Sequence, residues 1–236
     1  MNLTPQKSER TVLVTGANRG IGLETVRQLC AKGYRVLLGS RDPHKGERAR
    51  ARLLPQADPT VVELDVAAPK LEEQTQAILQ RHGSIDILIN NAGVHYDDWQ
   101  TASTVDWKIV REAFETNFFG AWRLAALLAP SMRERGWGRI VNVSSEVGAI
   151  ASLGKSTPAY AISKTALNAL TVCLAEEYRN TGVLINAVCP GWVATDMGGE
   201  GGRPVPEGAR SVVLAVELPD DGPSGSFLRD GKRIDW

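Results

Sequence analysis

Short apolar runs alternate with longer amphipathic segments along the chain. The runs are rich in β-branched and aliphatic residues, and the segments between them space their apolar positions by three or four, as helices do. Because the runs are nearly all apolar, they are typical of a parallel sheet covered on both faces. The predicted fold class is therefore α/β: a single doubly wound domain with a seven-stranded, mainly parallel sheet and helices on both faces. Strands are expected at residues 11–15, 34–39, 60–66, 85–89, 138–145, 183–189 and 225–229, and helices at residues 23–32, 69–83, 104–135, 158–181 and 204–217.

Size and composition fit one compact domain over residues 1–236, of which residues 1–10 form a polar N-terminal tail. Lys plus Arg and Asp plus Glu both total 27, so we expect no general attraction to nucleic acid or to an anionic membrane. No run of 18 apolar residues is present to span a membrane. Cys30, Cys173 and Cys189 lie far apart without metal-ligand spacing, so we expect buried, reduced thiols, no metal site and a cytoplasmic location.

A glycine-rich turn follows the first predicted strand and leads into the first predicted helix. Its sequence, Gly-Ala-Asn-Arg-Gly-Ile-Gly, covers residues 16–22. Glycines here let the backbone approach a pyrophosphate, and the helix N-terminus offers free N–H groups and a partial positive charge. The turn alone leaves open a tight strand-to-helix connection that binds nothing.

The end of the second predicted strand indicates which dinucleotide would bind. NAD-specific domains normally present an acidic residue there to the ribose 2′-hydroxyl, whereas this chain has Ser40 and Arg41. Arg41, together with Arg19 of the glycine turn and with Lys45 nearby, suits a 2′-phosphate, because guanidinium and phosphate form a charge-assisted pair. The sequence therefore favours NADP(H) over NAD(H), while Asp42 keeps NAD open as an alternative.

Polar and small residues mark further strand ends and one helical segment. Asp65 and Val66 end the third strand, and Asn-Asn-Ala-Gly at residues 90–93 ends the fourth, where small side chains leave room for a flat ring. Asn117 interrupts an aromatic stripe that is otherwise typical of core packing. Because a buried asparagine needs hydrogen-bond partners, Asn117 is either a structural bridge or part of a site.

Tyr160 and Lys164 carry the candidate chemistry. Thr157 followed by Pro158 is typical of an N-cap and first helical position, so we expect a helix to begin here. Four residues apart, Tyr160 and Lys164 share a helix face, about 6 Å apart along the axis, and a neighbouring ammonium favours the phenolate. The strand at residues 138–145 ends in two serines that can reach the same place. Alone, this spacing is weak evidence, and a solvated surface pair is its more common interpretation.

Together and in this order, the motifs resemble the classical short-chain dehydrogenase/reductase family over nearly the whole chain. Within that family, residues 206–236 are similar to carbonyl-reductase-like members. The resemblance implies a Rossmann fold that binds NAD(P), with a short substrate-side loop at residues 193–207. The residues that carry it are the glycine turn, Asn90-Asn91-Ala92-Gly93, Asn117, Ser144-Ser145, Tyr160-x-x-x-Lys164 and Pro190-Gly191.

The resemblance also implies roles for individual residues. Tyr160 would be the general acid/base, and Lys164 would lower its pKa and hold the nicotinamide ribose. Ser145, the later of the two serines, would fix the carbonyl, and Asn117 would belong to a proton relay. Cofactor binding falls to Gly16, Asn18, Arg19, Gly20, Ile21, Gly22, Ser40, Arg41, Asp65, Val66, Asn91, Ala92, Gly93, Tyr160, Lys164, Pro190, Gly191, Val193 and Thr195.

The expected activity is NADPH-dependent, reversible reduction of a ketone or aldehyde to an alcohol by hydride transfer. Three alternatives stay open: an NAD-dependent alcohol dehydrogenase, an epimerase or dehydratase with bound nucleotide, and a non-catalytic nucleotide-binding protein, since a fold alone does not prove activity. Val147, Leu153 and Trp192 would form an apolar wall for a bulky carbonyl substrate, whereas His95 and Tyr96 are interpreted as ordinary packing.

Two features of length affect the pocket and the assembly. Ser145 and Tyr160 are 15 residues apart, slightly more than is usual in the family, so the loop between them is expected to shape an individual pocket. The long insertion that monomeric carbonyl reductases carry before the tyrosine is absent. We therefore expect a homodimer or homotetramer through the outer helix faces.

Overall fold

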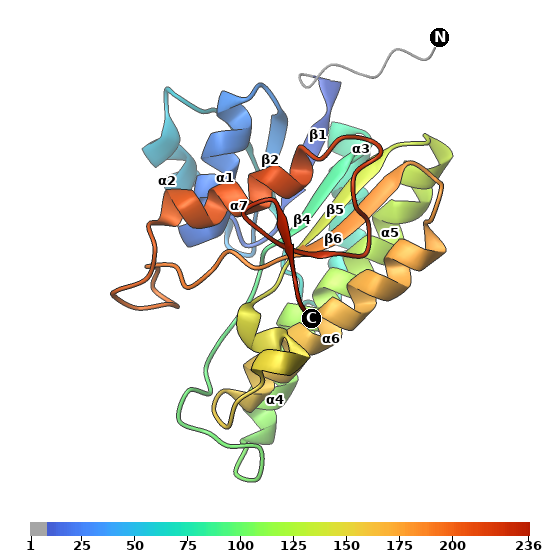
Figure 1. The fold of residues 1–236 in the computed structure, drawn as a ribbon. Helices are drawn as coiled ribbons and strands as arrows, with labels where there is room; N and C mark the ends of the chain where they lie inside the picture. Colours follow the sequence, from blue (N-terminus) through green and yellow to red (C-terminus); the bar gives the residue numbers. More distant parts are fainter. Residues whose placement is uncertain (1–8) are drawn as a thin grey trace.

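Eight strands form one sheet in the computed structural model, which describes residues 9–236. Their order is β3-β2-β1-β4-β5-β6-β7-β8, and every neighbouring pair is parallel except β7 with β8. The predicted doubly wound α/β fold is confirmed (Figure 1). Most of the predicted polar tail lies outside the described residues. The strands are β1 (Thr11–Val14), β2 (Arg35–Ser40), β3 (Thr60–Glu63), β4 (Ile87–Asn90), β5 (Gly138–Val143), β6 (Val183–Val188), β7 (Phe227–Arg229) and β8 (Lys232–Ile234).

Helices cover both faces of the sheet. In Figure 1, α1, α2 and α7 lie on one side, and α3, α5 and α6 lie on the other. No helix within residues 9–236 is long and apolar enough to cross a membrane. The helices are α1 (Gly20–Ala31), α2 (Pro43–Leu53), α3 (Leu71–His82), α4 (Trp107–Phe114), α5 (Gly120–Glu134), α6 (Pro158–Glu177) and α7 (Val205–Val216).

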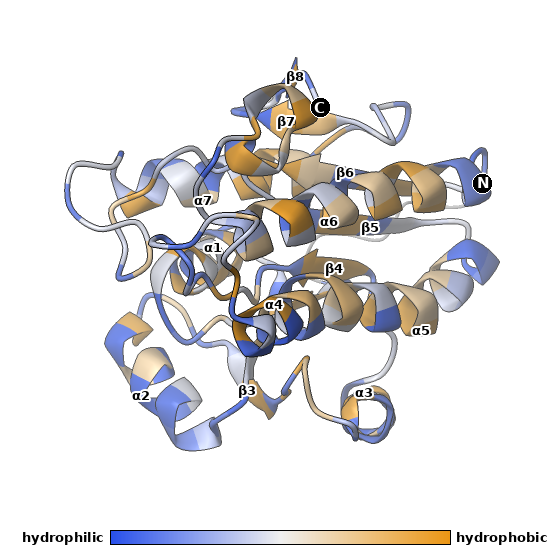
Figure 2. Cartoon of the chain, turned by 90° about the horizontal axis from the view of Figure 1, so that it is seen from below, coloured by the Kyte–Doolittle hydropathy of each residue, from blue (hydrophilic) through white to orange (hydrophobic). Residues whose placement is uncertain are grey.

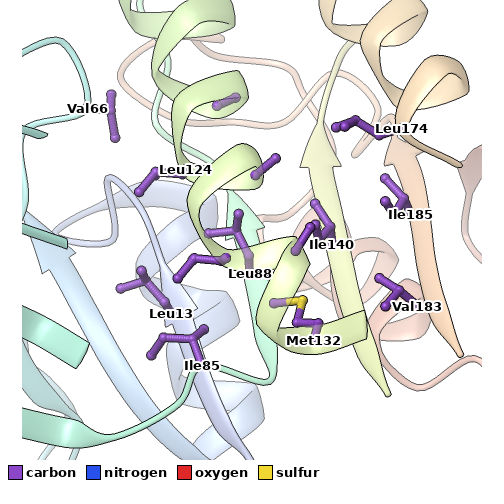
Figure 3. Close-up of a cluster of buried hydrophobic side chains, with 14 of the residues drawn as sticks. Leu13, Val66, Ile85, Leu88, Leu124, Met132, Ile140, Leu174, Val183 and Ile185 are labelled. Carbon is purple, nitrogen blue, oxygen red and sulfur yellow. The ribbon is translucent and has the colours of Figure 1, made fainter. Parts of the chain in front are cut away.

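The sheet divides the core into two clusters because successive strand residues point to opposite faces. On β1, Leu13 belongs to the cluster under α3, α5 and α6, which Figure 3 shows, whereas Val12 and Val14 belong to the cluster under α1, α2 and α7. All three side chains are fully buried. The central strands therefore read as continuous apolar runs, and this is why the sequence predicts them well.

Two elements, β8 and α2, are absent from the sequence prediction of seven strands and five helices. β8 is an eighth strand, antiparallel to β7, and the chain reverses at Asp230 and Gly231, both with positive φ. An Asp-Gly pair is a hairpin signal, so this turn was recognisable. The charged helix α2 has few apolar positions (Figure 2), and its signal is the start: Asp42 as N-cap before Pro43.

The predicted long helix at residues 104–135 is divided. A π-helical turn, Glu115–Phe119, separates α4 from α5 and contains the buried Asn117. Such turns insert an extra residue into a helix and are frequent at functional sites.

The three cysteines are free thiols, but only Cys189 is buried. Cys30 is partly exposed and Cys173, on the outer side of α6, is exposed. The prediction of three buried thiols is therefore wrong for Cys173.

Candidate active site

The glycine turn and the end of β4 contact each other where the strand order reverses, between β1 and β4. Gly16 has φ +60°, and a Cβ there would lie 2.8 Å from the Cα of Ala92. The Asn91 Nδ2 donates to the carbonyl oxygens of Thr15 and Gly16, at 2.9 and 3.2 Å. The Thr15 hydroxyl accepts from the backbone N–H groups of Asn91 and Ala92, at 3.0 and 2.9 Å. Two predicted cofactor motifs thus form one surface at the place where doubly wound domains bind ligands.

The N-terminus of α1 is uncapped beside this surface. Arg19 precedes it in an extended conformation without a side-chain cap, and the first turn contains no acidic residue. A Cβ on Gly22 would lie 2.4 Å from the Asn91 Nδ2, so the helix starts in close contact with the end of β4. Asn18 and Ile21 are partly buried in the same turn. Free N–H groups and the helix dipole give this place affinity for an anion.

At the end of β2, Arg41 is exposed and has no partner in the described part of the chain. The Asp42 carboxylate caps α2, accepting from the N–H groups of His44 and Lys45 at 2.9 and 3.2 Å. These bonds, first that from Lys45, hold the pKa of Asp42 below its ordinary value. Ser40 is buried and donates its hydroxyl to the Asp42 carbonyl at 2.7 Å. Asp42, the acidic residue that left NAD as an alternative, therefore uses its carboxylate to cap α2.

Gly93 connects the cofactor surface to the candidate catalytic residues. A Cβ on Gly93 would lie 3.4 Å from the Asn117 Oδ1 and 3.6 Å from the Lys164 Nζ. Asp65 and Val66 follow β3; Val66 is buried, and a Cβ on Gly120 would meet its carbonyl oxygen at 2.6 Å. This contact holds the start of α5, immediately after the π-helical turn, against the cofactor side of the sheet.

Tyr160, Ser145 and Lys164 converge beyond the end of β5. The Ser145 side chain lies close enough to the Tyr160 phenol to lower its pKa. The buried Lys164 Nζ donates to the Val143 carbonyl at 2.8 Å and lies 5.8 Å from the centroid of the Tyr160 ring. Ser144 is buried and its hydroxyl is 3.5 Å from the Lys164 carbonyl, so Ser145 is the serine that reaches the phenol.

Asn117 is a hydrogen-bond bridge to the same site. Its Oδ1 accepts from the Val94 N–H at 2.8 Å, and its Nδ2 donates to the Val94 carbonyl at 3.0 Å and to the Ser163 hydroxyl at 2.9 Å. Ser163 in turn donates to the Tyr160 carbonyl at 2.7 Å. Asn117 therefore joins the chain after β4 to the helix that carries Tyr160.

The pKa of Tyr160 moves in the direction opposite to the expectation. Burial raises it to about 12, which outweighs the lowering by the Ser145 side chain. Burial also lowers the pKa of Lys164 to about 8, because the charged ammonium is taken out of water. The expectation from the sequence considered only the neighbouring ammonium. Burial has the larger effect on the pKa of Tyr160.

The helix α6 begins at Pro158 with Thr157 at the N-cap position, as predicted, but Thr157 adopts a left-handed conformation with φ +55° and its side chain makes no cap bond. The cap comes from Asp97, which accepts from the Ala159 N–H at 2.6 Å. His95, interpreted from the sequence as packing, stacks on Tyr160 with ring centroids 4.7 Å apart. No local signal identifies Asp97 as the cap, because the contact joins residues far apart in sequence.

The apolar residues predicted for the substrate wall are accessible. Trp192 is 64% exposed, and Val147 and Leu153 are 38% and 43% exposed. The Trp192 Nε1 donates to the Gly198 carbonyl at 2.7 Å, which fixes the indole against the following loop. Val193 is buried, and the Thr195 methyl lies 3.5 Å from the position of a Cβ on Gly20. The loop therefore contacts the glycine turn, as expected for a cofactor-binding segment.

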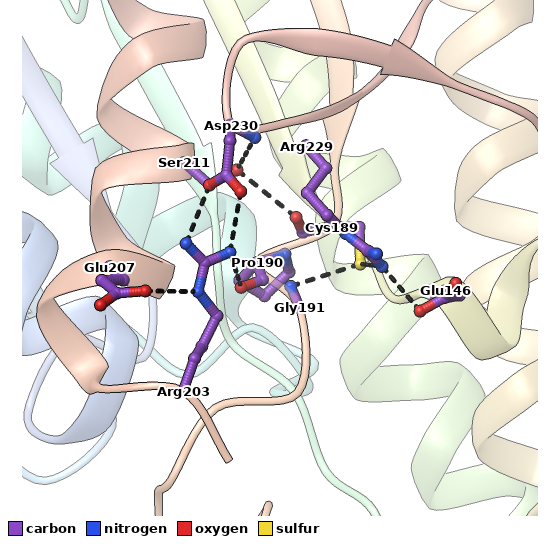
Figure 4. Close-up of polar contacts among 9 residues, drawn as sticks. All are labelled: Glu146, Cys189, Pro190, Gly191, Arg203, Glu207, Ser211, Arg229 and Asp230. Carbon is purple, nitrogen blue, oxygen red and sulfur yellow. Dashed lines mark hydrogen bonds and ion pairs between the residues drawn. The ribbon is translucent and has the colours of Figure 1, made fainter.

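Two arginines fix the Pro190-Gly191 turn (Figure 4). Arg229 donates to the Cys189 sulfur at 2.9 Å and to the Glu146 carboxylate at 2.7 Å, so it joins this turn to the loop after Ser145. Arg203 pairs with Asp230 at 3.0 and 3.1 Å, and its Cδ lies 3.0 Å from the position of a Cβ on Gly191. Sequence reasoning missed both arginines, whose partners are distant in sequence.

Comparison with known proteins gives consistent matches. Mouse "Carbonyl reductase [NADPH] 1" is 32% identical over 279 aligned positions, covering 97% of this chain and 99% of the mouse protein. The alignment is longer than the chain, so part of the mouse protein has no counterpart here. "(+)-neomenthol dehydrogenase" of Capsicum annuum is 31% identical, covering 94% of this chain and 96% of that protein.

Structural comparison agrees with these matches. The NADPH-bound carbonyl reductase from chicken fatty liver superposes with a TM-score of 0.84 at 31% identity, covering 96% of this chain and 99% of that one. The family model for short chain dehydrogenases matches residues 10–204, which include the glycine turn, the end of β4 and the Tyr160–Lys164 pair. The chain therefore belongs to the short-chain dehydrogenase family.

Proposed function

We propose that this protein uses NADPH to reduce a ketone or aldehyde to the alcohol, reversibly, with Tyr160 as the proton donor. The observation that carries the proposal is the convergence of Tyr160, Ser145 and Lys164 beside Gly93, at the edge of the sheet that also holds the glycine turn. Relatives named as NADPH carbonyl reductases support the same activity.

The residues present fit NADPH. The close contact at Gly16 and the uncapped start of α1 suit a pyrophosphate, and the unpaired Arg41 suits a 2′-phosphate. Arg19, which pairs with Asp196 at 2.8 Å between two exposed side chains, is a second cation for the phosphates. The remaining predicted cofactor residues, from Asp65 and Asn91 to Thr195, would surround the adenine, ribose and nicotinamide parts. NADPH supplies the hydride that a carbonyl carbon accepts.

Tyr160 would supply the proton to the carbonyl oxygen. With its pKa raised to about 12, the phenol stays protonated throughout the physiological pH range, which is the form needed in the direction of reduction. Ser145, which lies beside the phenol, would donate to the same carbonyl oxygen and orient it. Lys164 would hold the nicotinamide ribose, and Asn117 would connect the site to the interior through Ser163.

We also propose a substrate class, an assembly and a location. Val147, Leu153 and Trp192 offer an apolar, partly aromatic wall for a bulky carbonyl compound. Exposed Phe119, Trp122, Ile162 and Val172 on the outer helices support a homodimer or homotetramer. Three free thiols agree with the reducing conditions of the cytoplasm.

The test is NADPH consumption with a panel of aliphatic, aromatic and quinone carbonyl compounds. We expect oxidation of NADPH that depends on the carbonyl compound, and slower or no reaction with NADH. Reaction with NADH alone would favour the NAD-dependent alcohol dehydrogenase. Nucleotide binding without turnover of any compound in the panel would favour a binding protein or another reaction class.

A further inference from the structure

The first turn of α6, which carries Tyr160, is held by residues outside the helix. Thr157 is left-handed, a conformation that a β-branched residue rarely adopts, and it makes no cap bond. Pro158 has no N–H, and Ala159 is buried, so the Ala159 N–H is shielded from water. The Asp97 Oδ2 accepts from the N–H groups of Ala159 and Tyr160, at 2.6 and 3.4 Å. The helix start therefore depends on a carboxylate 62 residues away.

Asp97 is itself fully enclosed, with 1% of its surface exposed, and forms no ion pair within residues 9–236. Its Oδ2 is stabilised by the N–H groups and dipole of the helix that it caps, whereas its Oδ1 is buried without a hydrogen-bond partner among the described residues. Its contacts are with the backbone of α6, so its effect on the site passes through the position of that backbone.

His95 holds the ring of Tyr160. The two ring centroids are 4.7 Å apart with planes at 39°, within the range of favourable aromatic contacts. The His95 Nε2 is buried and has no hydrogen-bond partner within the described residues. The contact that the structure shows between His95 and Tyr160 is therefore packing of the two rings.

The segment that carries both residues is fastened to α6 a second time. Asn117 holds Val94 by two hydrogen bonds and reaches Ser163, whose hydroxyl donates to the Tyr160 carbonyl at 2.7 Å. Tyr160 is thus restrained at its N–H, at its carbonyl and at its ring by one segment, residues 94–97, and by the asparagine that supports it.

We propose that Asp97 and His95 are positioning residues for Tyr160: Asp97 fixes the first turn of α6, and His95 fixes the phenol ring. The activity measurements below rest on the proposed reductase function, whereas the hydrogen-exchange measurement does not.

The first experiment compares Asp97→Ala with Asp106→Ala in the full chain. Asp106 caps α4 from its own N-cap position, accepting from the Lys108 N–H at 2.8 Å, and is the control for a lost cap elsewhere in the chain. In Asp97→Ala, we expect amide hydrogen exchange at residues 159–161 to accelerate roughly five- to thirty-fold, the factor for a lost N-cap bond, with no change there in Asp106→Ala. Unchanged exchange in Asp97→Ala would overturn the capping role, whether or not the protein is a reductase.

The second readout is turnover of a carbonyl compound that the wild type reduces. We expect kcat to fall about 10- to 100-fold in Asp97→Ala, with the KM for NADPH within about twofold, because a displaced proton donor slows chemistry rather than cofactor binding. Asp97→Asn keeps an acceptor oxygen and should restore kcat to within about threefold of wild type. If Asp97→Ala does not fold, Asp97→Leu, which fills the same space without an acceptor, replaces it. Wild-type kcat in the Ala or Leu variant, or an equal loss in Asp97→Asn, would contradict the proposal.

The third comparison separates ring packing from proton transfer at His95. His95→Phe keeps a flat ring against Tyr160 and should retain kcat within about threefold, whereas His95→Ala should lose about tenfold. A large loss in His95→Phe with a changed pH profile would assign His95 a proton-transfer role instead. Equal activity of both variants would contradict a role for the His95 ring in positioning Tyr160.

Discussion

Lys164 is predicted to lower the stability of the fold in which it is buried. Its side chain is enclosed, its Nζ donates to the Val143 carbonyl, and no carboxylate pairs with it in the described ion pairs. Burial lowers its pKa from 10.5 to about 8. At about 1.4 kcal/mol per pKa unit, holding the ammonium charged at pH 7 costs about 3 kcal/mol of folding free energy.

Lys164→Met removes this charge and keeps the length of the side chain. The lost hydrogen bond to Val143 offsets about 1 kcal/mol, so we expect the variant to be about 2 kcal/mol more stable at pH 7. For a chain of this size, that corresponds to a Tm higher by about 4–8 °C. The same change should abolish turnover, since Lys164 is proposed to hold the cofactor.

The pH dependence has a definite sign. The folded pKa of about 8 lies below the ordinary value of 10.5, so the unfolded chain binds more protons between these values and wild-type stability rises with pH there. The advantage of Lys164→Met should therefore disappear as pH approaches 10.5. Tyr160 acts oppositely: its pKa is raised from 10 to about 12, so stability falls between these values in both proteins.

The assay is urea unfolding followed by tryptophan fluorescence at pH 7 and pH 10, without NADPH. Lys108→Met is the control, because the Lys108 side chain is 80% exposed, and its stability should change by less than about 0.5 kcal/mol at both pH values. A Lys164→Met variant that is less stable than wild type at pH 7, or equally shifted at both pH values, would show that burial of the Lys164 ammonium does not destabilise the fold.

Three further changes test individual parts of the site. Arg41→Ala should raise the KM for NADPH roughly 10- to 100-fold and leave that for NADH unchanged, as measured by initial rates; an unaltered preference would remove Arg41 from phosphate recognition. Trp192→Ala should raise the KM for a bulky aromatic ketone about tenfold but that for a small aldehyde less than twofold; equal effects would argue against a substrate wall. Asn117→Ala leaves partly buried backbone groups of Val94 and the buried Ser163 hydroxyl without this partner and should lower the free energy of unfolding by about 2–4 kcal/mol in urea titrations, and a change below about 0.5 kcal/mol would contradict its bridging role.

The sequence pattern was sufficient to predict those elements whose structure depends on residues close together in the chain. The strands β1, β2, β4, β5 and β6 are mainly apolar runs because both faces of the sheet are covered, and the glycine turn is required by the contact between Gly16 and Ala92. The spacing of Tyr160 and Lys164 also needed only the geometry of a helix.

Contacts between distant segments explain what the sequence did not predict. Thr157 before Pro158 is typical of an N-cap, yet Asp97 caps the helix because the chain after β4 passes its start. A neighbouring ammonium predicts a lowered pKa for Tyr160, but the direction depends on burial, which no sequence pattern measures. The π-helical turn at Asn117 likewise follows from its partners on Val94 and Ser163 rather than from its neighbours.

The most direct test of the proposed function is turnover by Tyr160→Phe beside the wild type, with NADPH and a carbonyl compound that the wild type reduces. The substitution removes only the phenol oxygen, so NADPH affinity, measured by quenching of tryptophan fluorescence, should stay within about threefold. Reduction should fall at least about a thousandfold, since proton donation at this position has no substitute. Retention of a substantial fraction of wild-type turnover by Tyr160→Phe would contradict the assignment of Tyr160 as the proton donor.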